Sequence, residues 1–142
     1  QSREVEKDLR IVGARTGWYD VGVQPDGDNK LVPSISFEIE NVSDRDIASV
    51  QLNAVFKRVG EDEAWGEHFV RGIDAEGLAP GAVSDSIVLR STLGYTGPQT
   101  RDQMLLNQLF VDARVEIFGK HGRRMWIKMA EFPVGRELLL EE

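Results

Sequence analysis

The sequence contains no cysteine and only two histidines. Without cysteine the chain can form no disulfide, no thiolate metal site and no cysteine nucleophile. A protein zinc site usually takes three or four ligands from His, Cys and carboxylate side chains. His68 lies in a charged segment and His121 lies in a turn between glycines, so neither is expected to be a metal ligand. The sequence therefore predicts no bound metal and no cofactor.

Long apolar runs and excess positive charge are also missing. No run reaches the roughly 18 apolar residues that span a bilayer. The chain has 17 Lys and Arg against 24 Asp and Glu, giving a net charge of −7, which repels a phosphate backbone and argues against nucleic acid as a partner. The chain begins with Gln1 rather than Met, so we expect a targeting or anchor sequence to have been removed, leaving the domain near a membrane. A boundary without biological meaning is the alternative.

The length and composition predict one globular domain. The chain has 142 residues, of which 41% are hydrophobic and 29% charged, a balance typical of folded proteins. Residues 1–8 are mostly polar and predict a flexible lead-in. Residues 9–136 are expected to form the domain. Residues 137–142 are expected to form a tail whose leucines either dock or belong to a following segment.

Apolar and polar residues alternate along most of the chain, which is typical of half-buried strands. Strands are predicted at residues 9–15, 18–23, 35–39, 50–56, 67–73, 83–89, 109–117 and 125–129. The connections differ in length, which favours a sandwich over an up-and-down barrel. The sequence thus predicts an all-β fold, an immunoglobulin-like β-sandwich of seven to eight strands.

The segment SISFEIENVSDRDIASVQLNAVF, residues 34–56, predicts two strands joined as a hairpin by the turn NVSDRD. Phe37, Ile39, Leu52, Ala54 and Phe56 are expected to face the core. The turn PDGDNK at residues 25–30 predicts a second hairpin. The sequence NVS at residues 41–43 also matches a glycosylation acceptor, although an Asn-Ser turn explains it adequately.

The period of two is broken at residues 100–109, TRDQMLLNQL. Thr100 and Gln103 have the spacing of a capping box, in which each side chain satisfies a backbone N–H at the helix start. Leu105 and Leu109 are four residues apart, as on one face of a helix. We therefore predict one short helix near residues 101–108, which needs packing against the sheets to be stable.

Three segments carry a family resemblance: SFEIEN followed by Ser43, IASVQLNAVF at residues 47–56, and LAPG at residues 78–81. Together they resemble the FxLYD-type immunoglobulin-like domains of the bacterial cell envelope. The chain departs from the family pattern after Phe56, where Lys57 and Arg58 follow. The resemblance covers residues 31–91 and implies an accessory or adhesion-type module in the periplasm or cell envelope, with no shared catalytic residues.

Two groups of residues are candidates for partner binding. Lys120, Arg123 and Arg124 lie in the predicted turn GKHGRR and could touch an acidic partner or anionic lipid, although a solvated turn is favoured because lipid-binding clusters hold about 4–8 basic residues. Trp65 and Tyr95 lie in aromatic-bearing connections, where exposed aromatic residues often anchor interfaces. The alternative, which is favoured, is that both fold back as plugs over the ends of the sandwich.

No Gly-x-Ser-x-Gly elbow and no Walker spacing occurs in the sequence, so no catalytic residue can be assigned. The leading hypothesis is a non-enzymatic module that binds or spaces protein partners in a bacterial cell-envelope assembly. The alternative is a carrier of lipid or a small molecule with a cavity between the sheets, and an enzyme is a third, weaker hypothesis.

Overall fold

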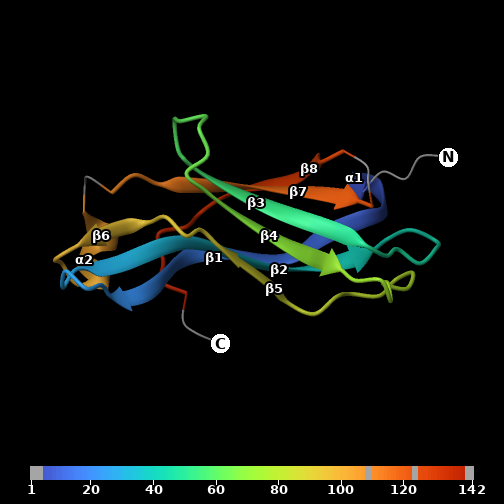
Figure 1. The fold of residues 1–142 in the computed structure, drawn as a ribbon, viewed down its shortest axis with the longest axis horizontal. Coiled ribbons are helices and arrows are strands. Elements are labelled where there is room, and N and C mark those ends of the chain that lie inside the picture. Colours follow the sequence, from blue (N-terminus) through green and yellow to red (C-terminus); the bar gives the residue numbers. More distant parts are fainter. Residues whose placement is uncertain (1–4, 108–109, 123–124, 140–142) are drawn as a thin grey trace.

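The structure, a computed structural model, describes residues 5–107, 110–122 and 125–139. Its strands form two antiparallel sheets that lie as two layers. Figure 1 shows β3, β7 and β8 above β1 and β2, with α2 and β6 at one end and α1 at the other. The elements in chain order are α1 Val5–Asp8, β1 Leu9–Val23, β2 Asn29–Asn41, β3 Val50–Arg58, β4 Gly66–Ile73, β5 Ile87–Arg90, β6 Tyr95–Gly97, α2 Arg101–Leu106, β7 Ala113–His121 and β8 Ile127–Pro133.

The strand order confirms the predicted all-β sandwich. The first sheet has the order β1-β2-β5, and β6 also pairs with β2; the second has the order β4-β3-β7-β8. The chain therefore changes sheet three times, between β2 and β3, between β4 and β5, and between β6 and β7. Hairpins join β1 to β2, β3 to β4 and β7 to β8. Such alternation between hairpins and crossings of the sandwich is the connectivity of immunoglobulin-like folds.

The predicted hairpin at residues 34–56 is wrong, because β2 and β3 belong to different sheets. Residues 42–49 cross the end of the sandwich instead of making a tight turn. The prediction of which residues face the core is nevertheless confirmed: Phe37, Ile39, Leu52, Ala54 and Phe56 are at most 1% exposed. Alternation shows which face of a strand is apolar. It does not show which sheet the strand joins, because the strands of both sheets turn an apolar face towards the core.

The two strands predicted at residues 9–15 and 18–23 are one long strand, β1. The register against β2 shifts between Val12 and Arg15, and Gly13 within this bulge has φ 64°. A bulge adds one residue and reverses which side chains face inward. This reversal interrupts the apolar pattern and gives one strand the appearance of two.

The predicted capping box is confirmed. The Thr100 side chain accepts a hydrogen bond from the Gln103 backbone N–H, and the Gln103 side chain accepts one from the Thr100 backbone N–H. The helix that follows is α2, Arg101–Leu106. It buries Met104 and Leu105 against the end of the sandwich, which supplies the packing that so short a helix requires.

Several predicted strands have other bounds in the structure, and β2 is longer than residues 35–39, since it covers Asn29–Asn41. β5 begins only at Ile87, because Val83 makes just an isolated bridge with Glu40 and is 49% exposed. β7 begins at Ala113, with Val111 exposed before it. Leu109 lies outside the described residues. β8 runs over Ile127–Pro133, so it begins after Met125 and continues beyond the predicted end.

Both terminal segments contact the domain where the structure describes them. Residues 5–8, predicted as part of a flexible lead-in, form α1, whose Val5 is 6% exposed and belongs to the core. At the other end, Leu138 makes a parallel bridge to Trp18, and the Trp18 backbone bonds to Glu137 and Leu139. Of the two expectations for the tail leucines, docking on the domain therefore applies to Leu138. Residues 1–4 and 140–142 lie outside the described residues.

Candidate functional site

The structure brings Trp65 and Tyr95 together, with ring centroids 5.0 Å apart. Both rings pack against Trp18, which is fully buried, and Tyr95 also packs against Phe110. We call these four residues, Trp18, Trp65, Tyr95 and Phe110, the aromatic plug. The Tyr95 hydroxyl donates a hydrogen bond of 2.9 Å to the Val111 carbonyl. These contacts match the plug alternative, while the partner-binding role of Trp65 and Tyr95 stays a prediction.

The environment of the plug is largely apolar. Burial of the Tyr95 phenol raises its pKa above the ordinary value, and the nearby Arg58 charge acts in the opposite direction. Beside Tyr95 lies a hollow of about 220 Å³ that is also lined by Pro98, Met104 and Phe110. Tyr95 belongs to β6, so the plug lies at the end of the sandwich that carries β6 and α2, two elements that Figure 1 shows side by side.

A second aromatic group lies on the outer face of the β4-β3-β7-β8 sheet. Phe69 of β4 is 61% exposed and Trp126, just before β8, is 36% exposed. Their ring centroids are 6.0 Å apart with an interplanar angle of 60°, a favourable edge-to-face geometry. Lys120 Nζ lies 5.4 Å from the centre of the Trp126 ring, within the range of a cation–π contact.

The strand register identifies the neighbours of this pair. Asn53 of β3 lies opposite both Phe69 and Phe118, and Gln51 lies opposite both Arg71 and Lys120. Because alternate residues share a face, these side chains all project from the outer face of the sheet. We call the set the aromatic face; it comprises Gln51, Asn53, Phe69, Arg71, Phe118, Lys120 and Trp126.

The aromatic face contains a hollow and an unsatisfied polar atom. The hollow has a volume of about 250 Å³ and is lined by Gln51, Leu52, Phe69, Val70 and Arg71. Asn53 is only 8% exposed, and its amide donates a hydrogen bond to Glu67. Its Oδ1 is buried and has no hydrogen-bond partner within the described part of the chain. Such orphaned acceptors are uncommon in folded proteins.

Next to the aromatic face, the same sheet carries a network of ion pairs centred on Glu116, which is 8% exposed. Its carboxylate lies 3.1 Å from Lys57, 3.5 Å from Lys128 and 3.8 Å from Arg114. A hydrogen bond with Glu131 raises the pKa of Lys128, and the same bond lowers the pKa of Glu131. Positive charge is therefore neutralised in this part of the sheet.

Of the predicted basic residues, Lys120 belongs to the aromatic face and is half-buried. Arg123 and Arg124 lie outside the described residues. Sequence analysis did not select Phe69 or Trp126. Phe69 has the same parity as the buried Ile73, but the register shifts between Val50 and Gln51, and this places Phe69 outside. The shift leaves no signal in the alternation pattern.

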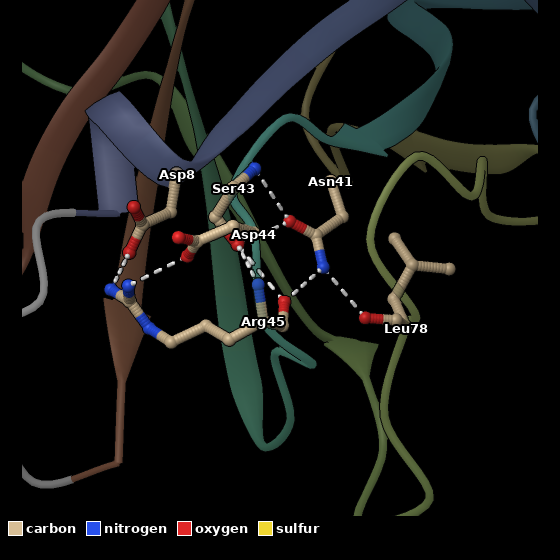
Figure 2. Close-up of polar contacts among 6 residues, drawn as sticks. All are labelled: Asp8, Asn41, Ser43, Asp44, Arg45 and Leu78. Carbon is tan, nitrogen blue, oxygen red and sulfur yellow. Dashed lines mark hydrogen bonds and ion pairs between the residues drawn. The ribbon is translucent and has the colours of Figure 1, made fainter.

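A group of hydrogen-bonded residues lies at the opposite end of the sandwich from the plug. We call Asp8, Asn41, Ser43, Arg45 and Leu78 the polar junction. Figure 2 shows the Asn41 side chain at its centre, donating to the carbonyl groups of Arg45 at 2.8 Å and Leu78 at 2.7 Å. Its Oδ1 accepts hydrogen bonds from the backbone N–H and the hydroxyl of Ser43. The Arg45 guanidinium lies 2.9 Å from Asp8. Asn41 is fully buried, so its amide is not accessible for glycosylation.

The histidines have separate positions. His68 Nδ1 accepts a hydrogen bond of 3.0 Å from the backbone N–H of Arg90, which links β4 to β5 across the sandwich. His121 ends β7 opposite Val50. Within residues 5–107, 110–122 and 125–139, no group of three or more His, Cys, Asp or Glu side chains is placed to hold a metal ion. No helix of this described part is long and apolar enough to cross a membrane.

No protein-family model matches the chain, and no curated protein matches it in sequence. The X-ray structure of Northeast Structural Genomics Consortium target SoR45 is similar, with a TM-score of 0.53 and 12% identity over 98% of this chain and 96% of that one. This likeness shows a shared fold alone.

Two further solved structures resemble the chain more weakly. The ligand-binding region of serine-glutamate repeat protein A (SgrA) of Enterococcus faecium has a TM-score of 0.40 and 11% identity over 87% of each chain. A structure described as the ApaA protein from Bordetella pertussis has a TM-score of 0.43 and 16% identity, covering 91% of this chain and 94% of that one. These two likenesses add nothing to the fold assignment.

Proposed function

We propose that this chain is a non-enzymatic protein-binding module of a bacterial cell-envelope assembly and that its partner binds the aromatic face. The observation that carries the proposal is the exposed contact between Phe69 and Trp126 on the outside of a sheet. Single exposed apolar residues are ordinary, but grouped aromatic residues are typical of interaction surfaces. The sheet beneath them holds the rings in place, which lowers the entropy that binding would cost.

We also propose a relationship to FxLYD-type domains and a periplasmic or cell-envelope location. Support comes from the polar junction, in which the segments that carry the resemblance meet. The Asn41 side chain bonds to the Leu78 carbonyl, and the Gly81 N–H donates to the Asn41 carbonyl. Ser43 completes the junction. Fractionation of the source cells, with an antibody against this chain, tests the location.

A lipid or small-molecule carrier is the second candidate, and one observation favours it. A groove of about 340 Å³ lies between β1 and β8 and is lined by Leu9, Ile11, Met129, Phe132 and four other residues. The centre of the sandwich is filled by core side chains such as Trp18 and Phe37, which are at most 1% exposed. Native mass spectrometry separates the candidates, because a carrier would retain a lipid or small molecule during purification.

A crosslinking pull-down from a native envelope extract tests the leading proposal. The baits are the wild-type chain, Phe69→Ser, and the matched control Val88→Ser. Val88 is 42% exposed on β5 in the other sheet. We expect wild type and V88S to retain the same stoichiometric partner, and F69S to bind it roughly 30-fold more weakly, since a central aromatic anchor contributes about 2 kcal/mol or more. Equal retention by F69S and wild type would contradict the proposal.

A further inference from the structure

We propose that the aromatic face recognises an acidic segment of its protein partner that carries an apolar side chain. This inference rests on the proposed function and adds the chemistry of the partner. The aromatic face combines two cations without ion pairs among the described residues, an exposed pair of aromatic rings and a hollow beside Phe69.

Arg71 and Lys120 of the aromatic face differ from most of the described basic side chains, because they make no ion pair with a described residue. Ion pairs with carboxylates hold most of the described basic side chains, which include Arg10, Arg45, Lys57, Arg58, Arg101, Arg114, Lys128 and Arg136. Arg71 and Lys120 make no ion pair within the part of the chain that the structure describes. In a protein of net charge −7, two unneutralised cations on one face favour an acidic ligand over a basic one.

The spacing of the two cations suits one bound segment. Arg71 and Lys120 both lie opposite Gln51, on the strands that flank it. Adjacent strands are about 4.8 Å apart, so the backbones of the two cationic residues are separated by roughly 10 Å. A single peptide crossing the sheet can therefore place one carboxylate near each. Arg71 is exposed, and its guanidinium can pair with a carboxylate through two parallel hydrogen bonds.

The apolar part of the ligand has a defined place. The hollow of about 250 Å³ lies between Phe69 and Arg71 and can receive one apolar side chain. The ring of Phe69 forms its wall and is held by Trp126. A ligand with only negative charge would leave the hollow and the exposed ring of Phe69 without a partner.

Selection from a displayed library of random dodecapeptides tests the inference and does not require the natural partner to be identified. The targets are the wild-type chain, Arg71→Glu, Phe69→Ser and the matched control Lys30→Glu. Lys30 has no ion pair among the described residues and lies on β2 of the other sheet. We expect wild type and K30E to enrich peptides rich in Asp and Glu with an apolar residue between them. R71E should lose these peptides, with binding at least about tenfold weaker, because a like charge replaces the cation.

Salt provides an independent readout on the enriched peptides. Raising NaCl from about 0.1 M to about 1 M shortens the Debye length from about 10 Å to about 3 Å. The affinity of wild type should therefore fall about tenfold, whereas the affinity of R71E should change little.

The outcomes separate the inference from the proposed function. Enriched peptides that need Phe69 but carry no acidic excess, or that bind R71E equally well, would overturn the inference and leave the protein-binding proposal standing. Peptides that bind F69S as well as wild type would overturn both, and so would the absence of any enrichment. Stronger binding to vesicles of anionic phospholipid than to the peptides would replace the acidic segment with a membrane surface.

Discussion

Asn41 shows how one side chain can join three segments in a protein that lacks disulfides. Its amide contacts the carbonyl groups of Arg45 and Leu78, and its oxygen receives two donors from Ser43 (Figure 2). The residue is fully buried. Every polar atom of the side chain is therefore used where water cannot replace a lost partner, which is the situation in which hydrogen bonds matter most.

Replacing Asn41 with Ala should lower the free energy of unfolding by about 2–4 kcal/mol, because it removes four hydrogen bonds of a fully buried side chain at once. Ser43→Ala removes only the hydroxyl bonds and should cost about 1 kcal/mol. Urea denaturation of the two variants and wild type measures both values. A loss below that of S43A would show that the Asn41 side chain does not hold the junction.

Tyr95 gives a prediction for pH dependence. Its pKa is raised in the folded protein by burial, while an unfolded tyrosine titrates near pH 10. The folded state therefore holds the phenol proton more tightly, and this contribution to stability is present below about pH 10 and is lost as the pH rises through the folded-state pKa. Comparing the pH dependence of unfolding for wild type and Tyr95→Phe between about pH 8 and 11 should show the extra loss in wild type only. If the stability of wild type and of Tyr95→Phe changed in parallel with pH, the predicted contribution of the Tyr95 phenol would be contradicted.

The sequence predicted the positions of some residues of the site but not of others. The pairs Thr100–Gln103 and Asn41–Ser43 act over two or three positions, so their spacing alone predicts their hydrogen bonds. Phe69 depends on a register shift between β3 and β4, which pairs Val50 with Ile73 but Gln51 with Arg71. Gly72 lies at this shift, and a Cβ there would lie only 2.7 Å from the Leu52 Cδ1.

At the scale of elements, short-range patterns predicted the hairpin of β1 and β2 correctly but placed β2 and β3 wrongly in one sheet. β2 and β3 were expected as a hairpin because both alternate and a polar turn separates them, yet they lie in opposite sheets. The segment between β2 and β3 crosses the sandwich, and it is held by the hydrogen bond from Asn41 to Leu78 and by the bridge between Ile47 and Leu78. Such long-range contacts are invisible in local periodicity.

Helix α2 provides a test at this scale. Thr100→Ala removes the side chain that accepts from the Gln103 N–H, and the loss of an N-cap typically costs about 1 kcal/mol. Since α2 buries only Met104 and Leu105, we expect the helix to open locally before the sheets do. Hydrogen exchange should become faster in residues 101–106 and remain unchanged in β3 and β7. Uniform acceleration in all three elements would contradict a local role.

At the scale of the whole molecule, the sandwich has two different ends and an exposed outer face. The aromatic plug closes the end near α2, and the polar junction holds the end near α1. The aromatic face lies on the outside of the β4-β3-β7-β8 sheet, away from the core. This separation predicts that stability and partner binding respond to different substitutions.

Trp65→Ala tests that separation from the plug side. Because Trp65 is partly buried against Trp18 and Tyr95, we expect a loss of roughly 2 kcal/mol, below the 3–5 kcal/mol of a fully buried aromatic residue. The melting temperature should fall while the partner retained in the pull-down stays the same. An unchanged melting temperature together with loss of the partner would show that Trp65 binds the partner, and it would contradict a packing role in the aromatic plug.

Site-specific photo-crosslinking in the native source tests the central claim most directly. A photoreactive phenylalanine analogue is placed singly at Phe69, at Trp126 and at the control position Val88, all of which are exposed. The account predicts the same discrete protein adduct from positions 69 and 126 and none from position 88. The absence of an adduct at both aromatic positions, or an equal adduct at position 88, would contradict binding through the aromatic face.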